Sequence, residues 1–174
     1  MSIRAEALAA RIEEGARTLA SFAERLTDSE WNTVVRPDGR TVGVIVHHVA
    51  NVYPIEIQLV RQVASGSPIE DVTWPLVADM NAIHAHENRD CCKHETLHLL
   101  ARNSREAAEA VRALTDEQLD TAAAVSLNAG APLTAQFVIE DHAVRHSWHH
   151  LAKVRTALEK VRPMNRRPSL VSVL

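Results

Sequence analysis

Glycine and aromatic residues are scarce in this sequence, and their scarcity argues against a fold built mainly from β-strands. The 174 residues include 5 glycines, 7 prolines and only 3% aromatic side chains, while Ala, Leu, Val, Glu and Arg are abundant. Most of these abundant residues favour helices. Since 46% of the residues are hydrophobic, the chain can bury one core of useful size, and we predict a single, mostly helical domain.

A strong excess of charge of either sign is also missing. The formal net charge is -3, and no run of Lys and Arg interleaved with aromatic residues is present. Such a chain offers no basic field to attract a phosphate backbone. We therefore predict that nucleic acid is not a partner.

No segment has the pattern of a membrane span or a signal peptide. The most apolar window, residues 42–60, contains two histidines, an asparagine and a glutamate, each of which is costly at membrane depth. The N-terminus lacks the basic-then-apolar order of a signal peptide, and the only cysteines, Cys91 and Cys92, are adjacent and poorly placed for a structural disulfide. These features predict a cytoplasmic protein without a membrane partner.

Apolar residues recur at helical spacing in four long segments, and no strong strand pattern lies between them. The third segment is expected to bend or break around residues 88–92, and the second contains Pro54, which is expected to kink it. Four amphipathic helices predict an all-α four-helix bundle, with residues 1–162 as the domain and 163–174, which holds two of the prolines, as a C-terminal tail. The segments run over about residues 2–26, 41–65, 76–114 and 134–158, and Trp74 is expected in the loop before the third.

Four histidines lie within nine residues of the fourth predicted helix. At about 100° per residue, His150 falls inside the apolar face of this helix and His146 falls at its edge. His142 and His149 project progressively further from the core. His146 and His150 are spaced i, i+4, which stacks their imidazoles on one face, so these two are the best candidates for metal ligands.

A third candidate ligand lies in the second predicted helix, in the sequence "VIVHHVANV". His48 projects into the middle of the apolar stripe there, whereas His47 is about 100° away from it. A buried imidazole needs partners for its ring nitrogens, and the Val, Ile and Leu side chains around His48 offer none. A metal shared with His146 and His150 would supply one. The alternative is a core histidine bonded to a buried polar group, with the fourth-helix histidines in solvent.

A competing motif, His94-Glu95-Thr96-Leu97-His98, matches the H-E-x-x-H pattern of zinc proteases. Helical projection places His94 and His98 towards solvent, and no strand pattern is present to hold an extended peptide. We therefore rank a protease below the three-histidine site. Histidines 84 and 86 are two residues apart and cannot share a helical face, so we expect both at the surface or in a loop.

The same residues resemble a known family, the DinB/YfiT-like four-helix metalloproteins. Two stretches carry the resemblance, "GRTVGVIVHHVANVYPIEIQLVRQVASG" and "RHSWHHLAKV", the second being similar to the family's W-H-G-x-H-H-x-x-H-I signature. The resemblance implies His48, His146 and His150 as the ligands of a divalent metal. It also implies a bundle with a long crossover between helices two and three, and a homodimer.

Three histidine ligands leave a coordination position for water or substrate, which is typical of a catalytic site. Our leading hypothesis is a zinc- or nickel-dependent enzyme of the hydrolase or, by the resemblance, thiol S-transferase type. It would act on a small-molecule substrate, for which a low-molecular-weight thiol is a candidate. Glu56, Asp141 and His142 are candidate partners of the ligands, and no catalytic residue is assigned. The alternative is a non-catalytic bundle that a metal stabilises, serving in stress response or as an interaction module.

Overall fold

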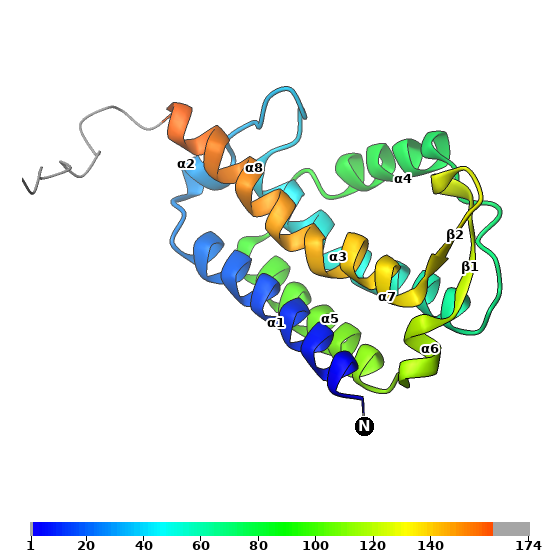
Figure 1. Ribbon diagram of the computed structural model, residues 1–174. Helices are drawn as coiled ribbons and strands as arrows, with labels where there is room; N and C mark the ends of the chain where they lie inside the picture. Colours follow the sequence, from blue (N-terminus) through cyan, green and yellow to red (C-terminus); the bar gives the residue numbers. More distant parts are fainter. Residues whose placement is uncertain (1, 162–174) are drawn as a thin grey trace, which may run out of the picture.

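Four helical segments pack side by side in a computed structural model of the protein, which describes residues 2–161. Helix α5 (Lys93–Arg112) packs against both α1 (Ile3–Glu24) and α3 (Val42–Ala64). The last segment packs against α1 and α3 from the other side, and it consists of α7 (Ala135–Val138), the π-helix η2 (Ile139–Val144) and α8 (Arg145–Val161). Each segment thus has two neighbours, and the predicted four-helix bundle is confirmed (Figure 1).

Hydroxyl side chains fix where three of the four bundle segments begin. Ser2, Thr41 and Thr134 precede α1, α3 and α7, and each hydroxyl oxygen accepts a hydrogen bond from the backbone N–H three residues further on. This contact satisfies one of the free N–H groups of the first turn. Helix α3 continues through Pro54 to Ala64, so the most apolar window of the sequence forms one helix inside the bundle.

Trp31 closes one end of the core. It ends the short helix α2 (Asp28–Trp31) and is 6% exposed, and its indole N–H donates to the carbonyl oxygen of Cys91 at 3.2 Å. The indole ring lies directly on Gly43, where a Cβ atom would come within 2.4 Å of the indole nitrogen. Glycine is therefore required at the start of α3 for the tryptophan to pack there.

The third predicted segment is two helices rather than one. Helix α4 (Trp74–Glu87) ends before the predicted interruption, and α5 begins after it. Only α5 belongs to the bundle, whereas α4 lies outside it beside α3 (Figure 1). The prediction of Trp74 in a loop was wrong, because Thr73 caps α4 and Trp74 is its first residue. Residues 65–92, including α4, form the long crossover between the second and third bundle helices.

A small β-hairpin follows the helix α6 (Asp116–Asp120) and was not predicted. Strands β1 (Ala122–Val125) and β2 (Ala131–Thr134) pair antiparallel around the 3-10 turn η1 (Ser126–Asn128). The backbone of Ile69 joins this hairpin, with its N–H donating to Ala124 and its carbonyl accepting from Ser126, both at 2.8 Å. The hairpin therefore fastens the start of the crossover to the end of the bundle.

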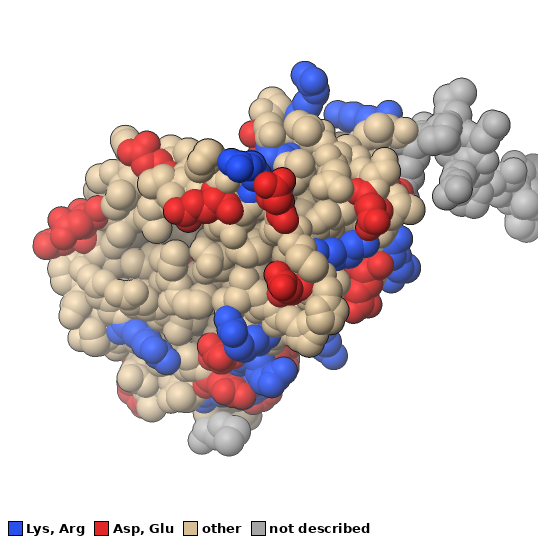
Figure 2. Space-filling view, turned by 180° about the vertical axis from the view of Figure 1, so that it is seen from behind, with Lys and Arg blue, Asp and Glu red and all other residues tan. Residues whose placement is uncertain are grey.

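The predicted C-terminal tail, residues 163–174, lies outside the described residues. Among residues 2–161, no helix is long and apolar enough to cross a membrane. On the face seen in Figure 2, Lys and Arg side chains alternate with Asp and Glu, and no continuous basic patch is present on that face.

Candidate metal centre

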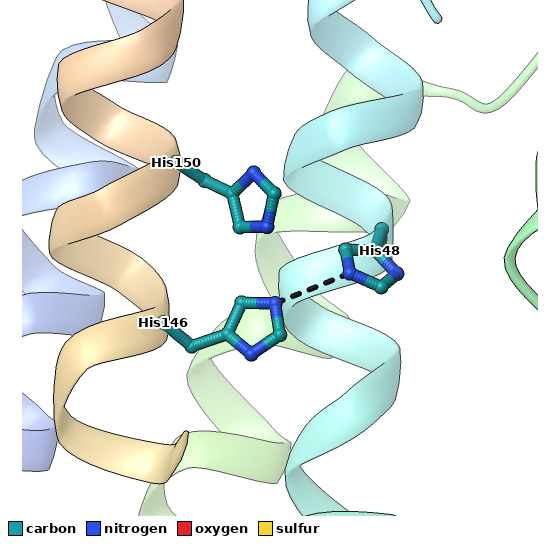
Figure 3. Close-up of side chains that lie close together, drawn as sticks. All are labelled: His48, His146 and His150. Atoms are coloured by element: carbon teal, nitrogen blue, oxygen red, sulfur yellow. Dashed lines mark hydrogen bonds between the residues drawn. The ribbon is translucent and has the colours of Figure 1, made fainter. Parts of the chain in front are cut away.

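Three histidines from two helices converge between α3 and α8. His48 projects from α3, and His146 and His150 project from successive turns of α8 (Figure 3). One ring nitrogen of each histidine lies within 4.8 Å of the others, and the Nε2 atoms of His48 and His146 are 3.1 Å apart. The structure therefore brings together the three side chains that helical projection and the family resemblance singled out.

Burial keeps two of these imidazoles neutral. His48 is 6% exposed and His150 is 7% exposed. Desolvation lowers the pKa of His48 to about 3 and that of His150 to about 2, and the neighbouring imidazoles add to both shifts. A neutral imidazole keeps a lone pair on one ring nitrogen, which is the form that binds metal ions.

Glu56 fixes the orientation of His146. It lies on α3 two turns after His48, is 5% exposed, and its Oε1 atom accepts a hydrogen bond from Nδ1 of His146 at 2.6 Å. A proton on Nδ1 leaves Nε2, the atom that faces His48, as an acceptor. Such carboxylate–histidine pairs commonly orient metal ligands. Glu56 was one of three candidate partners, and helical projection alone did not place it.

An ionic cluster holds the two ligand helices against each other. Asp38, just before α3, accepts hydrogen bonds from the Arg40 guanidinium at 2.6 and 2.8 Å, and it also pairs with Lys153 of α8. Hydrogen bonding to Arg40, with a smaller contribution from Lys153, holds the pKa of the Asp38 carboxyl well below its usual range. Lys153 lies one turn after His150, so this cluster fixes α8 relative to α3 next to the histidines.

A π-helical turn precedes the histidine pair on α8. The π-helix η2 spans Ile139–Val144, and such turns are frequent at functional sites. Beyond it, the hydroxyls of Tyr53 and Ser147 form a fully buried hydrogen bond of 2.7 Å between α3 and α8. Tyr53 is thus a packing residue. The extra residue of the π-turn changes the rotation per residue, so a uniform projection is not valid for His142.

A cavity of about 430 Å³ lies between α3, α4 and the η2–α8 segment, and the three histidines form part of its wall. His142 and His149 line it as well, together with Glu56, Asp141 and Arg145. The four histidines of the last helix thus face one cavity, with His146 and His150 nearest His48. A molecule in this cavity would reach all three converging side chains.

One histidine near the site was wrongly predicted to lie at the surface or in a loop. His84 of α4 is 8% exposed, and its Nε2 atom is 2.9 Å from Nδ1 of His47. Its ring centroid is 5.6 Å from that of His48. Burial lowers the pKa of His84 to about 4. A separation of two residues prevents histidines 84 and 86 from sharing one helical face, but it still allows one of them to point inward.

The H-E-x-x-H segment lies at the start of α5, apart from this cluster. His94 and His98 are both exposed, as predicted, and their Nε2 atoms are 3.2 Å apart. They line a different surface hollow with Glu24 and Cys92. Among residues 2–161, only His48, His146 and His150 form a group of three or more potential ligands with mutually close ligand atoms.

The converging residues suit a divalent transition metal. Nδ1 of His150 and Oε2 of Glu56 are buried and have no hydrogen-bond partner among the described residues. An unpartnered buried polar atom is costly, and a neutral imidazole nitrogen can be satisfied by a metal. Imidazoles are good ligands for zinc and nickel, and three of them leave further coordination positions open. These three imidazoles, which also face the cavity, are therefore suited to hold a divalent metal ion.

Comparison with known proteins gives two matches. The model of the family described as the DinB superfamily matches residues 11–154. A solved structure, described as "YfiT from Bacillus subtilis is a probable metal-dependent hydrolase with an unusual four-helix bundle topology", superposes with a TM-score of 0.74. It is 21% identical, and the match covers 92% of this chain and 90% of that chain, so the likeness supports the fold alone. No curated protein sequence matches this chain.

Proposed function

This chain belongs to the DinB superfamily, and we propose that it is a metal-dependent enzyme acting on a small molecule. The observation that carries the proposal is the convergence of three histidines, two of them deeply buried, on the wall of a cavity. His48, His146 and His150 would hold one divalent ion, with zinc and nickel as the first candidates. When bound, such an ion supplies Lewis-acid activation of a water molecule or a thiol.

The surrounding residues have separate tasks in this proposal. Glu56 orients His146 through the Nδ1 hydrogen bond, and the cluster of Asp38, Arg40 and Lys153 holds the ligand-bearing helices in register. His142 and His149 present imidazoles to the cavity and are the candidates for holding or moving a proton of a bound molecule. In this proposal they do not bind the metal, unlike His48, His146 and His150.

Two reaction types suit such a site, hydrolysis and thiol transfer. The similar YfiT structure is described as a probable metal-dependent hydrolase, which favours hydrolysis. Thiol transfer is supported by the family resemblance. Both reactions need a position next to the metal for the attacking water or thiol, and three protein ligands leave that position available.

The test uses metal-loaded wild-type protein, His146→Ala and the matched control His94→Ala. Each is assayed with a panel of activated esters and amides, and with thiols plus electrophiles. We expect turnover in at least one arm, a loss of about a hundredfold or more in His146→Ala, and no loss in His94→Ala.

The visible spectrum of the cobalt-substituted protein separates the two reaction types from a structural role. A shift on adding a thiol favours the transferase, and turnover of an ester without that shift favours the hydrolase. A cobalt spectrum indifferent to every thiol and small anion, with no turnover in any arm, would contradict the enzymatic proposal and favour a metal that only stabilises the bundle.

A further inference from the structure

The cavity beside the three histidines has one apolar wall. Helix α3 contributes one turn after another of branched aliphatic side chains, and α4 covers them from outside the bundle. Leu127 of the hairpin turn and Val72 of the crossover close one edge. The apolar residues in this wall are Val52, Ile55 and Leu59 of α3 and Trp74, Leu76, Val77 and Met80 of α4.

Exposed apolar side chains are concentrated at this cavity. Ten large hydrophobic residues are exposed in the described part of the chain, and four of them line it. Trp74 is 64% exposed, and Leu76 and Met80 are each 43% exposed. Apolar patches that remain exposed in a folded protein commonly mark a binding site. Helix α4, which lies outside the four-helix bundle, carries three of these four residues.

The opposite wall is polar but has little free charge. It is formed by Asp141, His142, Arg145 and His149 of the η2–α8 segment. Nε of Arg145 lies 3.1 Å from Oδ1 of Asp141 and also donates to the Asp141 carbonyl oxygen at 3.0 Å, so the two charges neutralise each other. This wall therefore offers hydrogen bonds without an uncompensated cation to select an anionic group.

We propose that this enzyme takes an uncharged amphiphilic substrate, with an apolar aliphatic or aromatic body along α3 and α4 and a hydrogen-bonding flank towards α8. The cavity volume, about 430 Å³, lies in the range of small-molecule sites. The placement of the reacting group at His48, His146 and His150 rests on the proposed function. The apolar body rests only on the cavity walls, so the two parts can fail separately.

The first experiment measures chain-length dependence with n-alkyl hydroxamic acids of two to eight carbons, bound to zinc-loaded protein and followed by calorimetry. The hydroxamate group chelates the ion, and the tail reports on the cavity. Burial of each methylene group predicts about fourfold tighter binding per carbon until the cavity is filled. A terminal carboxylate on a tail of equal length should weaken binding at least tenfold, because its charge would be desolvated. A flat series, or tighter binding of the carboxylate, would overturn the proposal.

Helix α4 offers a matched pair of variants. Met80 lines the cavity, and Ile83 does not, although both are exposed and lie on the same helix. Met80→Gln should weaken the longest hydroxamate by roughly fivefold through lost apolar contact, whereas Ile83→Gln should leave it unchanged. Equal effects of the two variants would contradict an apolar subsite at this cavity.

A metal-independent measurement separates this inference from the proposed function. The uncharged apolar dye Nile red is titrated into metal-stripped protein, where we expect enhanced fluorescence for wild type and Ile83→Gln and about threefold weaker binding for Met80→Gln. Dye binding with this pattern, but no zinc uptake, supports the apolar subsite and contradicts the proposed function. Zinc uptake with no such dye binding and a flat hydroxamate series contradicts the apolar subsite alone.

Discussion

Replacing Glu56 with glutamine should weaken metal binding without unfolding the protein. Glutamine keeps the volume of the side chain and can still accept from Nδ1 of His146, but the hydrogen bond loses its charge. A hydrogen bond to a charged group contributes about 1.5–3 kcal/mol, against about 0.5–1.5 kcal/mol for a neutral pair. The difference, about 1–1.5 kcal/mol, predicts a metal affinity roughly tenfold weaker, at the lower end of the effect expected for a residue that orients a metal ligand.

The fold should respond differently from the metal site to this substitution. Oε2 of Glu56 is buried and has no hydrogen-bond partner among residues 2–161, so the wild-type carboxylate is incompletely satisfied. Removing its charge relieves this cost. This gain offsets the weaker hydrogen bond to His146, so the free energy of unfolding of the metal-free Glu56→Gln protein should be close to that of wild type.

Competition titrations with a chromophoric chelator measure the affinity, and urea unfolding of the metal-free protein measures the stability. Asp141→Asn is the matched control, because Asp141 also lines the cavity but its carboxylate pairs with Arg145 rather than with a ligand histidine. An unchanged affinity in Glu56→Gln, or an equal loss in Asp141→Asn, would show that the Glu56 carboxylate does not strengthen metal binding through His146.

The stability of the fold should depend on pH, on the Asp38 carboxylate and on Gly43. Between pH 7 and pH 5.5, the free energy of unfolding of the metal-free protein, measured in urea, should fall by about 1 kcal/mol for each of His48 and His150. Burial depresses the pKa values of both histidines, so below about pH 6.5 the unfolded chain takes up protons that the folded chain does not, and the free energy of unfolding falls. If the difference in unfolding free energy between wild type and His150→Gln were independent of pH, this prediction would be wrong. Asp38→Asn should lower the free energy of unfolding by about 2 kcal/mol at pH 7, and this loss should shrink below about pH 4. Pairing with an arginine and a lysine depresses the pKa of the wild-type carboxyl, so its stabilising effect is lost as the pH falls. Gly43→Ala should lower the unfolding free energy by about 2 kcal/mol, since the new Cβ would lie 2.4 Å from the Trp31 indole nitrogen; a thermal midpoint equal to wild type would show that the ring can move aside.

Helical periodicity was sufficient to predict the bundle and the inward direction of the three histidines. His48 lies in the middle of a regular apolar stripe, and His146 and His150 follow the π-turn, so uniform rotation describes both segments well. The degree of burial follows the same projection. His150, predicted inside the apolar face, is buried, and His146, predicted at its edge, is partly exposed.

The contacts that complete the site depend on elements whose position the sequence does not reveal. Helix α4 has apolar residues all round rather than on one stripe, so projection could not tell that His84 faces inward or that Met80 lines a cavity. Each strand of the hairpin has only four residues, mostly small, which is too short for a period of two to stand out. Glu56 could be identified as a partner of His146 only once the register of α3 against α8 was known.

Metal content shows whether the three converging histidines bind a divalent ion. Wild-type protein, three single alanine variants and the matched control His94→Ala are stripped, reloaded with zinc or nickel, desalted and analysed for bound metal. We expect about one equivalent of metal in wild type and in His94→Ala, and loss of tight binding in His48→Ala, His146→Ala and His150→Ala. Stoichiometric metal retained by all three of these variants, or lost only in His94→Ala, would contradict it.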